Sequence, residues 1–153
     1  MKDVIDDICK YILDNLYDEI TLEQMEKEFF YSKYHIIRIF KQYTGFTIKE
    51  YINNAKILKT IDPLLFTNDT ILKIALNHGF NSQEYYSEKF QNVIGIPPLK
   101  FRKEFSEIDS NDKHILKMKK EYLDYLTQYQ ERLLNISDNP NKGNNKIKRL
   151  SIM

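Results

Sequence analysis

The stretch Ser32-Lys-Tyr-His-Ile-Ile-Arg-Ile-Phe-Lys-Gln-Tyr-Thr-Gly45 predicts a complete amphipathic helix with both of its ends marked. Ser32 can cap the helix with its hydroxyl oxygen, and Gly45 can adopt the positive φ that ends it. Between them the apolar residues follow a helical period and share one face; they are Ile36, Ile39, Phe40 and Tyr43. The sequence therefore predicts a helix over 33–43 with one buried and one exposed face.

A second, shorter helix precedes this one. Thr21 can cap it, and Gln24 stands at the position that completes a capping box. The apolar spacing predicts a helix over 22–29, followed by a turn over 30–32. Two helices joined by so short a turn are typical of a helix-turn-helix unit, here about 20–45.

The chain matches itself at an offset of 50 residues. Identical pairs fall at Leu22 and Leu72, Phe30 and Phe80, Ser32 and Ser82, Phe40 and Phe90, and Gly45 and Gly95. The pattern predicts a second helix-turn-helix unit over about 70–95, with helices over 72–77 and 83–93.

The other segments are also helical in pattern. Apolar periodicity predicts an opening helix around Ile5–Leu16, a linker helix over about 48–61 and a short helix after Pro97-Pro98. Pro63 should end the linker helix near Ile61, because proline disfavours helical geometry in the residue before it. The fold class expected is all-α, with two helix-turn-helix subdomains joined by a linker helix, plus an extra C-terminal helix.

Composition excludes several kinds of protein. The single cysteine, Cys9, rules out an internal disulfide and a cysteine-based zinc site and suits a reducing cytosol. His35, His78 and His114 lack metal-ligand spacing, and we expect neither a metal nor another cofactor. No secretory signal, membrane span or catalytic constellation is recognisable, so we expect a cytoplasmic protein that is not an enzyme.

Two stretches resemble the AraC/XylS family of bacterial transcription regulators. Ser32–Gly45 is similar to the family's first recognition helix. The stretch Ile74-Ala-Leu-Asn-His-Gly-Phe-Asn-Ser-Gln-Glu-Tyr-Tyr-Ser-Glu-Lys-Phe90, with Gly95-Ile-Pro-Pro-Leu-Lys-Phe-Arg102, looks like its C-terminal signature. Both units, their spacing and the closing motif occur in order within about residues 3–105.

The resemblance implies a DNA-binding domain of seven helices over 1–105. It implies two recognition helices in successive major-groove segments of double-stranded DNA, and activation through contact with RNA polymerase. Because the match begins almost at Met1, we expect the layout of the family's single-domain members, without an effector domain before the match.

The exposed face of the first recognition helix predicts DNA contacts. Arg38 can pair bidentately with guanine, Lys33 and Lys41 suit phosphates, Ile37 can touch a thymine methyl, and Tyr34 can lie against a sugar or base edge. The alternative is a solvated helix face that carries a stray aromatic.

The second recognition helix is less suited to DNA. Its outward residues are Gln83, Glu84, Ser87, Glu88 and Gln91. Gln can read adenine and Glu can accept from cytosine, but two carboxylates near phosphates are unfavourable. A weakened, backbone-following unit and an unusual base reader therefore stay open, and the first unit should carry most of the specificity.

Residues 106–153 lie outside the resemblance. A helix is expected within 106–136, about 113–135, with a heptad-like stripe: Ile115, Tyr122, Leu126, Tyr129, Leu133 and Ile136. The stripe can pack back on the domain or form a weak dimer. Residues 137–153 read as a flexible basic tail, with Lys146–Arg149 able to add non-specific DNA affinity.

Charge leaves two functions open. Net charge is only +1, and residues 1–105 carry 14 basic and 15 acidic residues, a net of −1. A sequence-specific transcription regulator is favoured by the motifs. The alternative is a protein-interaction regulator that keeps the fold but binds DNA weakly, which the near-neutral charge and the acidic second unit favour.

Overall fold

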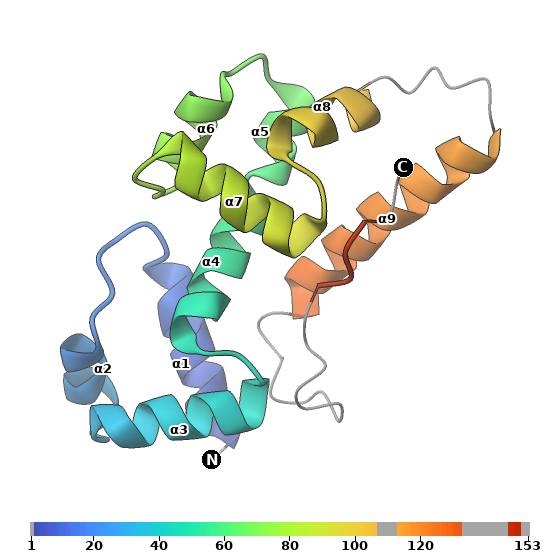
Figure 1. Cartoon of the computed structure of the whole chain (residues 1–153). Coiled ribbons are helices and arrows are strands. Elements are labelled where there is room, and N and C mark those ends of the chain that lie inside the picture. The colour runs from blue at the N-terminus through green and yellow to red at the C-terminus, as the bar shows by residue number, and fades with distance from the viewer. Residues whose placement is uncertain (1, 107–112, 133–146, 151–153) are drawn as a thin grey trace. The chain divides into compact units, whose positions relative to one another are not determined.

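The computed structural model describes residues 2–106, 113–132 and 147–150 (Figure 1). Within those residues the chain forms helices and no strand, which confirms the predicted all-α class. The helices are α1 (Lys2–Asp14), α2 (Leu22–Phe29), α3 (Lys33–Thr44), α4 (Ile48–Lys59), α5 (Ile61–Phe66), α6 (Ile71–Asn77), α7 (Gln83–Ile94), α8 (Pro98–Ser106) and α9 (Lys113–Arg132).

Two compact units divide the chain within α4. Among the described residues, the first comprises 2–55 with 130–132, and the second comprises 56–106, 113–129 and 147–150. Each unit contains one helix pair of the helix-turn-helix type, α2 with α3 and α6 with α7. The predicted domain boundaries, 1–105, 106–136 and 137–153, follow the family resemblance and stay a prediction.

The core of the first unit comes from the faces that the sequence marks as apolar. Ile5, Ile8 and Ile12 of α1 are fully buried, as the opening-helix pattern predicts. The Phe40 ring meets the edge of the Tyr51 ring at a centroid distance of 5.4 Å. This packing leaves the opposite face of α3 in solvent.

The linker helix breaks earlier than its predicted end at Ile61. α4 stops at Lys59 and α5 starts at Ile61, with Pro63 inside the first turn, where a missing N–H is tolerated. Thr60 at the break is buried, and its hydroxyl accepts a hydrogen bond from the Tyr86 hydroxyl at 2.8 Å. The break gives eight helices over residues 2–106 in place of the seven that the resemblance implies.

The offset of 50 residues between the two helix pairs does not hold along their whole length. The caps Ser32 and Ser82 are 50 residues apart, but Thr21 and Thr70, which cap α2 and α6, are 49 apart. The distance from cap to cap is therefore one residue longer in the second pair, because its turn (78–82) is two residues longer and α6 is one residue shorter than α2. The pairing of Leu22 with Leu72 and of Phe30 with Phe80 was wrong for this reason.

Burial confirms the shift. Phe80 is 3% exposed, whereas Phe30 is 91% exposed. Phe30 has φ 59, in the left-handed region, and in the second turn that conformation belongs to Gly79 with φ 81. Phe30 thus corresponds to Gly79 and not to the core residue Phe80.

The C-terminal helix packs within the second unit. Tyr122, Leu126 and Tyr129 are buried, and the Tyr122 ring lies 6.3 Å from the Phe105 ring of α8. Lys119 donates a hydrogen bond to the carbonyl oxygen of Glu104. Of the two alternatives for the stripe, this favours packing within the chain; Leu133 and Ile136 lie outside the described residues.

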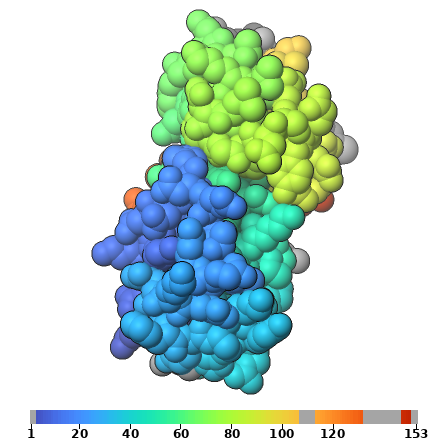
Figure 2. All heavy atoms as spheres, turned by 90° about the vertical axis from the view of Figure 1, so that its left-hand side faces the viewer, coloured from blue at the N-terminus to red at the C-terminus, as the bar shows by residue number. Residues whose placement is uncertain are grey.

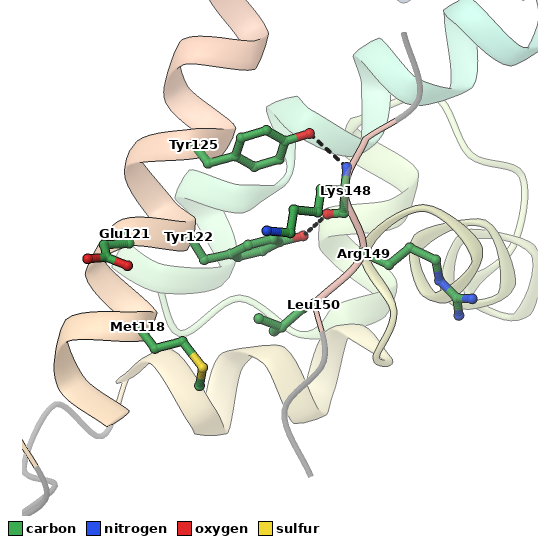
Figure 3. Close-up of a pocket in the computed structure, with 7 residues that line it drawn as sticks. All are labelled: Met118, Glu121, Tyr122, Tyr125, Lys148, Arg149 and Leu150. Atoms are coloured by element: carbon green, nitrogen blue, oxygen red, sulfur yellow. Dashed lines mark hydrogen bonds between the residues drawn. The ribbon is translucent and has the colours of Figure 1, made fainter. Parts of the chain in front are cut away.

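Part of the predicted tail packs in the same way. Ile147 and Leu150 are buried, while Lys148 and Arg149 are exposed. The Lys148 amide donates to the Tyr125 hydroxyl at 2.7 Å, and the Tyr122 hydroxyl donates to the Lys148 carbonyl at 3.0 Å (Figure 3). Residues 147–150 are therefore held against α9, and 137–146 and 151–153 lie outside the described residues.

Candidate nucleic-acid interface

α3 is built as a helix that presents one face to solvent. The Ser32 hydroxyl accepts from the His35 amide at 3.2 Å, and Gly45 ends the helix with φ 81. Ile36, Ile39 and Phe40 are buried. Because these buried residues fix the rotation of the helix about its axis, they also determine which side chains face solvent.

The structure brings the predicted contact residues of the first unit together on that outward face. Tyr34 is 74% exposed and Ile37 is 44% exposed. Arg38 and Lys41 are exposed, and Lys33 is half-buried. Figure 2 shows this helix, in light blue, at the surface of its unit.

The cations of this face differ in how firmly they are held. Lys33 Nζ lies 3.9 Å from Glu23 Oε1 and 5.6 Å from the centre of the Tyr34 ring. Its amide also donates to Glu26 Oε1 at 2.6 Å. Of these two carboxylates only Glu23 lies near the Lys33 ammonium, and Glu26 holds its backbone amide.

Arg38 and Lys41 make hydrogen bonds to groups of α3 and its C-cap. Arg38 Nη2 donates to His35 Nδ1 at 2.8 Å, since a guanidinium has no acceptor, and Lys41 Nζ donates to the Gly45 carbonyl at 2.9 Å. Both bonds are exposed, so they can be exchanged for a base edge or phosphate at small cost. α3 holds three basic and no acidic residues, a net of +3.

The second recognition helix has the same construction with different charge. The Ser82 hydroxyl accepts from the Tyr85 amide at 3.1 Å, and Gly95 ends α7 with φ 114. Tyr86, Phe90 and Ile94 are buried. Figure 2 shows α7, in yellow-green, at the surface of its own unit.

The predicted outward residues of α7 are at the surface, as expected from that core. Gln83, Glu84, Glu88 and Gln91 are exposed and Ser87 is half-buried. With Lys89 as its single cation, α7 has a net charge of −1 (one basic, two acidic). Lys89 Nζ lies 5.3 Å from the centre of the Tyr85 ring. The positive charge of α3 is thus missing from this helix.

Lys56 is a cation near the second turn that the sequence analysis did not consider. Its Nζ donates to the Gly79 carbonyl at 3.3 Å and lies 5.9 Å from the centre of the Phe80 ring. Desolvation lowers its pKa, and the neighbouring Tyr85 opposes this. Lys56 therefore supports the turn, and its place there depends on a contact across 23 residues that no local motif signals.

Phe30 lies in the predicted turn over 30–32, but no role at the surface was predicted for it. Its exposure of 91% places it at the surface, two residues before the cap of α3. The signal that could have found it is the 49-residue spacing of Thr21 and Thr70.

A cavity of about 290 Å³ lies in the second unit between α9 and residues 148–150 (Figure 3). The hydroxyls of Tyr122 and Tyr125, which line it, are engaged by the backbone of Lys148. Among the described residues no cluster of His, Cys, Asp or Glu could hold a metal ion. In the same residues no helix is long and apolar enough to cross a membrane.

Two capped helix pairs, each with its second helix open to solvent, define a helix-turn-helix protein of the DNA-binding class. A family model described as "Helix-turn-helix domain" matches residues 25–104. The chain belongs to the AraC/XylS family of helix-turn-helix transcription regulators, which confirms the resemblance. It is a DNA-binding regulator of transcription and not an enzyme.

Relatives and solved structures agree with this. The chain is 36% identical to the multiple antibiotic resistance protein MarA of Escherichia coli over 64% of its own length and 77% of that protein. It is 30% identical to the transcriptional activator AarP of Providencia stuartii, over 76% of this chain and 84% of AarP. The C-terminal domain of AraT, a response regulator from Geobacillus stearothermophilus, shares the fold with a TM-score of 0.60 and 24% identity, over 72% of this chain and 94% of that one.

Proposed function

We propose that the chain is a sequence-specific transcription activator that binds promoter DNA with the exposed faces of α3 and α7. The observation that carries this proposal is the outward face of α3, where Arg38, Lys41 and Ile37 stand together on a helix whose rotation is fixed by its core. An arginine on such a face suits the bidentate pattern of guanine, and an isoleucine suits a thymine methyl.

The first unit supplies most of the specificity in this proposal. α3 has a net charge of +3 and α7 has a net charge of −1, although both are outward-facing helices of the same construction. In this proposal α7 contacts the backbone of the duplex with the side chains of Gln83, Gln91 and Ser87. Its carboxylates reduce the affinity that the phosphates would otherwise give.

The test begins with selection of bound sequences from a random duplex library of about 30 base pairs, which spans two successive major-groove segments. Affinities for a selected and a random duplex are then compared for Arg38→Ala, Glu88→Ala and the control Lys120→Ala, which removes an exposed cation of α9. We expect Arg38→Ala to lose about 1–3 kcal/mol on the selected duplex and much less on the random one. Equal large losses for Arg38→Ala and Glu88→Ala would contradict the unequal roles.

We propose that the chain activates transcription through contact with RNA polymerase in the bacterial cytoplasm. We also propose that it acts as a monomer. The monomer is supported by the burial of Tyr122, Leu126 and Tyr129 within the chain, because these three residues of the stripe are then not available to a dimer. Transcription in vitro from a promoter that contains the selected site tests the step, with and without the protein. Occupancy without increased transcription would contradict activation.

The second candidate is a regulator that acts through protein contacts and binds DNA weakly. Glu84 and Glu88, both exposed on α7, favour it, as does the net charge of only +1. A salt titration on random duplex separates the two functions, because phosphate contacts give a negative slope of log K against log salt. Absence of binding at low salt would favour the second candidate.

A further inference from the structure

The turn between α2 and α3 holds Phe30 in a conformation that few bulky residues adopt. Its φ is 59 and its ψ is 32, and it is the single non-glycine residue with positive φ in the described part of the chain. A β-carbon in the left-handed region meets the following carbonyl oxygen, so the conformation is strained. In the second unit Gly79 occupies the same place without that strain.

Packing does not account for this phenylalanine. With 91% of its surface exposed, the ring gains little from burial, while it adds apolar surface in contact with water. A glycine would satisfy the turn, as the second unit shows. Strained residues that the fold does not require are concentrated at functional sites.

The position of Phe30 connects it to the outward face of α3. It lies two residues before the cap Ser32, and Tyr34 and Ile37 of the helix that follows are exposed as well. In helix-turn-helix proteins the N-terminal end of the recognition helix meets the base edges in the major groove. The turn before that end therefore reaches the sugar-phosphate backbone at the edge of the groove.

The charges around this end of α3 leave room for an apolar contact. Lys33, the nearest cation of the helix, is paired with Glu23, and the chain as a whole has little basic excess. Ionic contacts with phosphates are thus fewer than in a strongly basic protein. The apolar C–H face of deoxyribose offers a contact that needs no charge.

We propose that the Phe30 ring packs against a deoxyribose of the DNA backbone where α3 enters the major groove. The inference rests on the proposed DNA binding by α3. Such a contact reads no base edge and releases no counterion. It therefore adds affinity equally on every sequence and at every salt concentration.

The experiment compares the full-length chain with Phe30→Gly on the selected and the random duplex, by fluorescence anisotropy over a range of salt. We expect the affinity to fall by about fivefold or more, by the same factor on both duplexes, with an unchanged salt slope. Thermal denaturation should show a midpoint that is not lowered, because the substitution removes the strained β-carbon. Phe30→Leu, which keeps an apolar side chain, should retain most of the affinity.

Two control variants make the result specific. Phe66→Ser removes a phenylalanine of α5 that is 79% exposed, and it should leave the affinity unchanged. Lys41→Ala removes an exposed cation of α3 and should reduce the salt slope by about one, which Phe30→Gly should not do.

Several results would overturn the inference. Equal affinities of the unaltered chain and Phe30→Gly would do so and leave the proposed function standing. A loss confined to the selected duplex would indicate base reading, and a loss of transcription without a loss of affinity would indicate a protein contact. A lowered denaturation midpoint would assign the ring to the fold. Absence of binding by the unaltered chain would overturn the proposed function and this inference together.

Discussion

Gly95 at the end of α7 should tolerate no side chain, for two separable reasons. Its φ is 114, which L-residues rarely adopt. A β-carbon built there would lie 2.6 Å from the carbonyl oxygen of Leu150 and 3.1 Å from its amide nitrogen. Gly95→Ala therefore strains the backbone of the turn and also pushes residues 149–150 away.

The size of each part can be worked out separately. The backbone part is about 1–2 kcal/mol, reduced by about 0.4–1 kcal/mol because alanine restricts the unfolded chain more than glycine does. The contact part is limited by what holds the segment, since residues 147–150 can detach to avoid the clash. If residues 149–150 alone move away while Ile147 and Lys148 keep their contacts, the loss is set mainly by the burial of Leu150, which is 8% exposed, at about 1.5–3 kcal/mol.

A double-mutant cycle separates the two parts. Gly95→Ala is measured in the full chain and in a chain that ends at residue 146, by urea denaturation followed by far-UV circular dichroism. We expect a loss of about 2–4 kcal/mol in the full chain and about 1 kcal/mol in the shortened one. Gly45→Ala, at the corresponding cap of α3 with φ 81, should cost about 1 kcal/mol in both chains.

Equal costs of Gly95→Ala in the two chains would refute the reasoning. That result would mean that residues 149–150 do not lie against the end of α7, and that the glycine serves only the backbone conformation. The same result would remove the reason for assigning residues 147–150 to the second unit.

Four further predictions concern the buried groups Tyr86 and Cys9 and the exposed side chain of Ile37. Burial raises the pKa of Tyr86, and its hydrogen bond to Thr60 opposes this. Because the unfolded chain then loses this proton at a lower pH than the folded chain, the free energy of unfolding should fall as pH rises above about 10. Alkaline denaturation curves should show a smaller fall for Tyr86→Phe, which has no hydroxyl to titrate. Tyr86→Phe should itself cost about 1 kcal/mol at neutral pH in urea denaturation, because it removes a buried hydrogen bond. Burial raises the pKa of Cys9 to about 12, so alkylation by iodoacetamide should be much slower in the folded chain than in urea, and equal rates would contradict its burial. If Ile37 meets a thymine methyl, replacing thymine by uracil in the selected duplex should weaken binding of the unaltered chain but not of Ile37→Ala, measured by anisotropy.

The ends of the helices could be predicted because their determinants are local. Ser32 and Ser82 accept from amides three residues ahead, and the glycine at 45 stands where the helix must turn. The outward face of α3 follows from its apolar period alone, so its exposed residues could be predicted as well. Each of these features depends on residues within one or two helical turns.

The features that the sequence analysis missed depend on distant residues. The break after Lys59 involves the hydrogen bond between Thr60 and Tyr86, 26 positions apart. The approach of Leu150 to Gly95 spans 55 positions, and neither residue carries a local mark of it. The pairing of Phe30 with Phe80 failed for another reason, since one extra residue between the caps of α6 and α7 moves the residues before it out of the common register.

The acidic residues of α7 have different explanations, and this decides which of them can test the second unit. Glu84 lies in the first turn, where a carboxylate is stabilised by the partial positive charge of the helix N-terminus. Its presence is therefore explained by the fold whether or not α7 meets DNA, and its replacement would change stability and binding together. Glu88 lies in the middle of the helix, outside the reach of that effect, and is exposed. Glu88→Gln removes the charge and keeps the shape, so increased affinity on every duplex would indicate a helix that only follows the backbone. Reduced affinity confined to the selected duplex would indicate that the carboxylate accepts from a base.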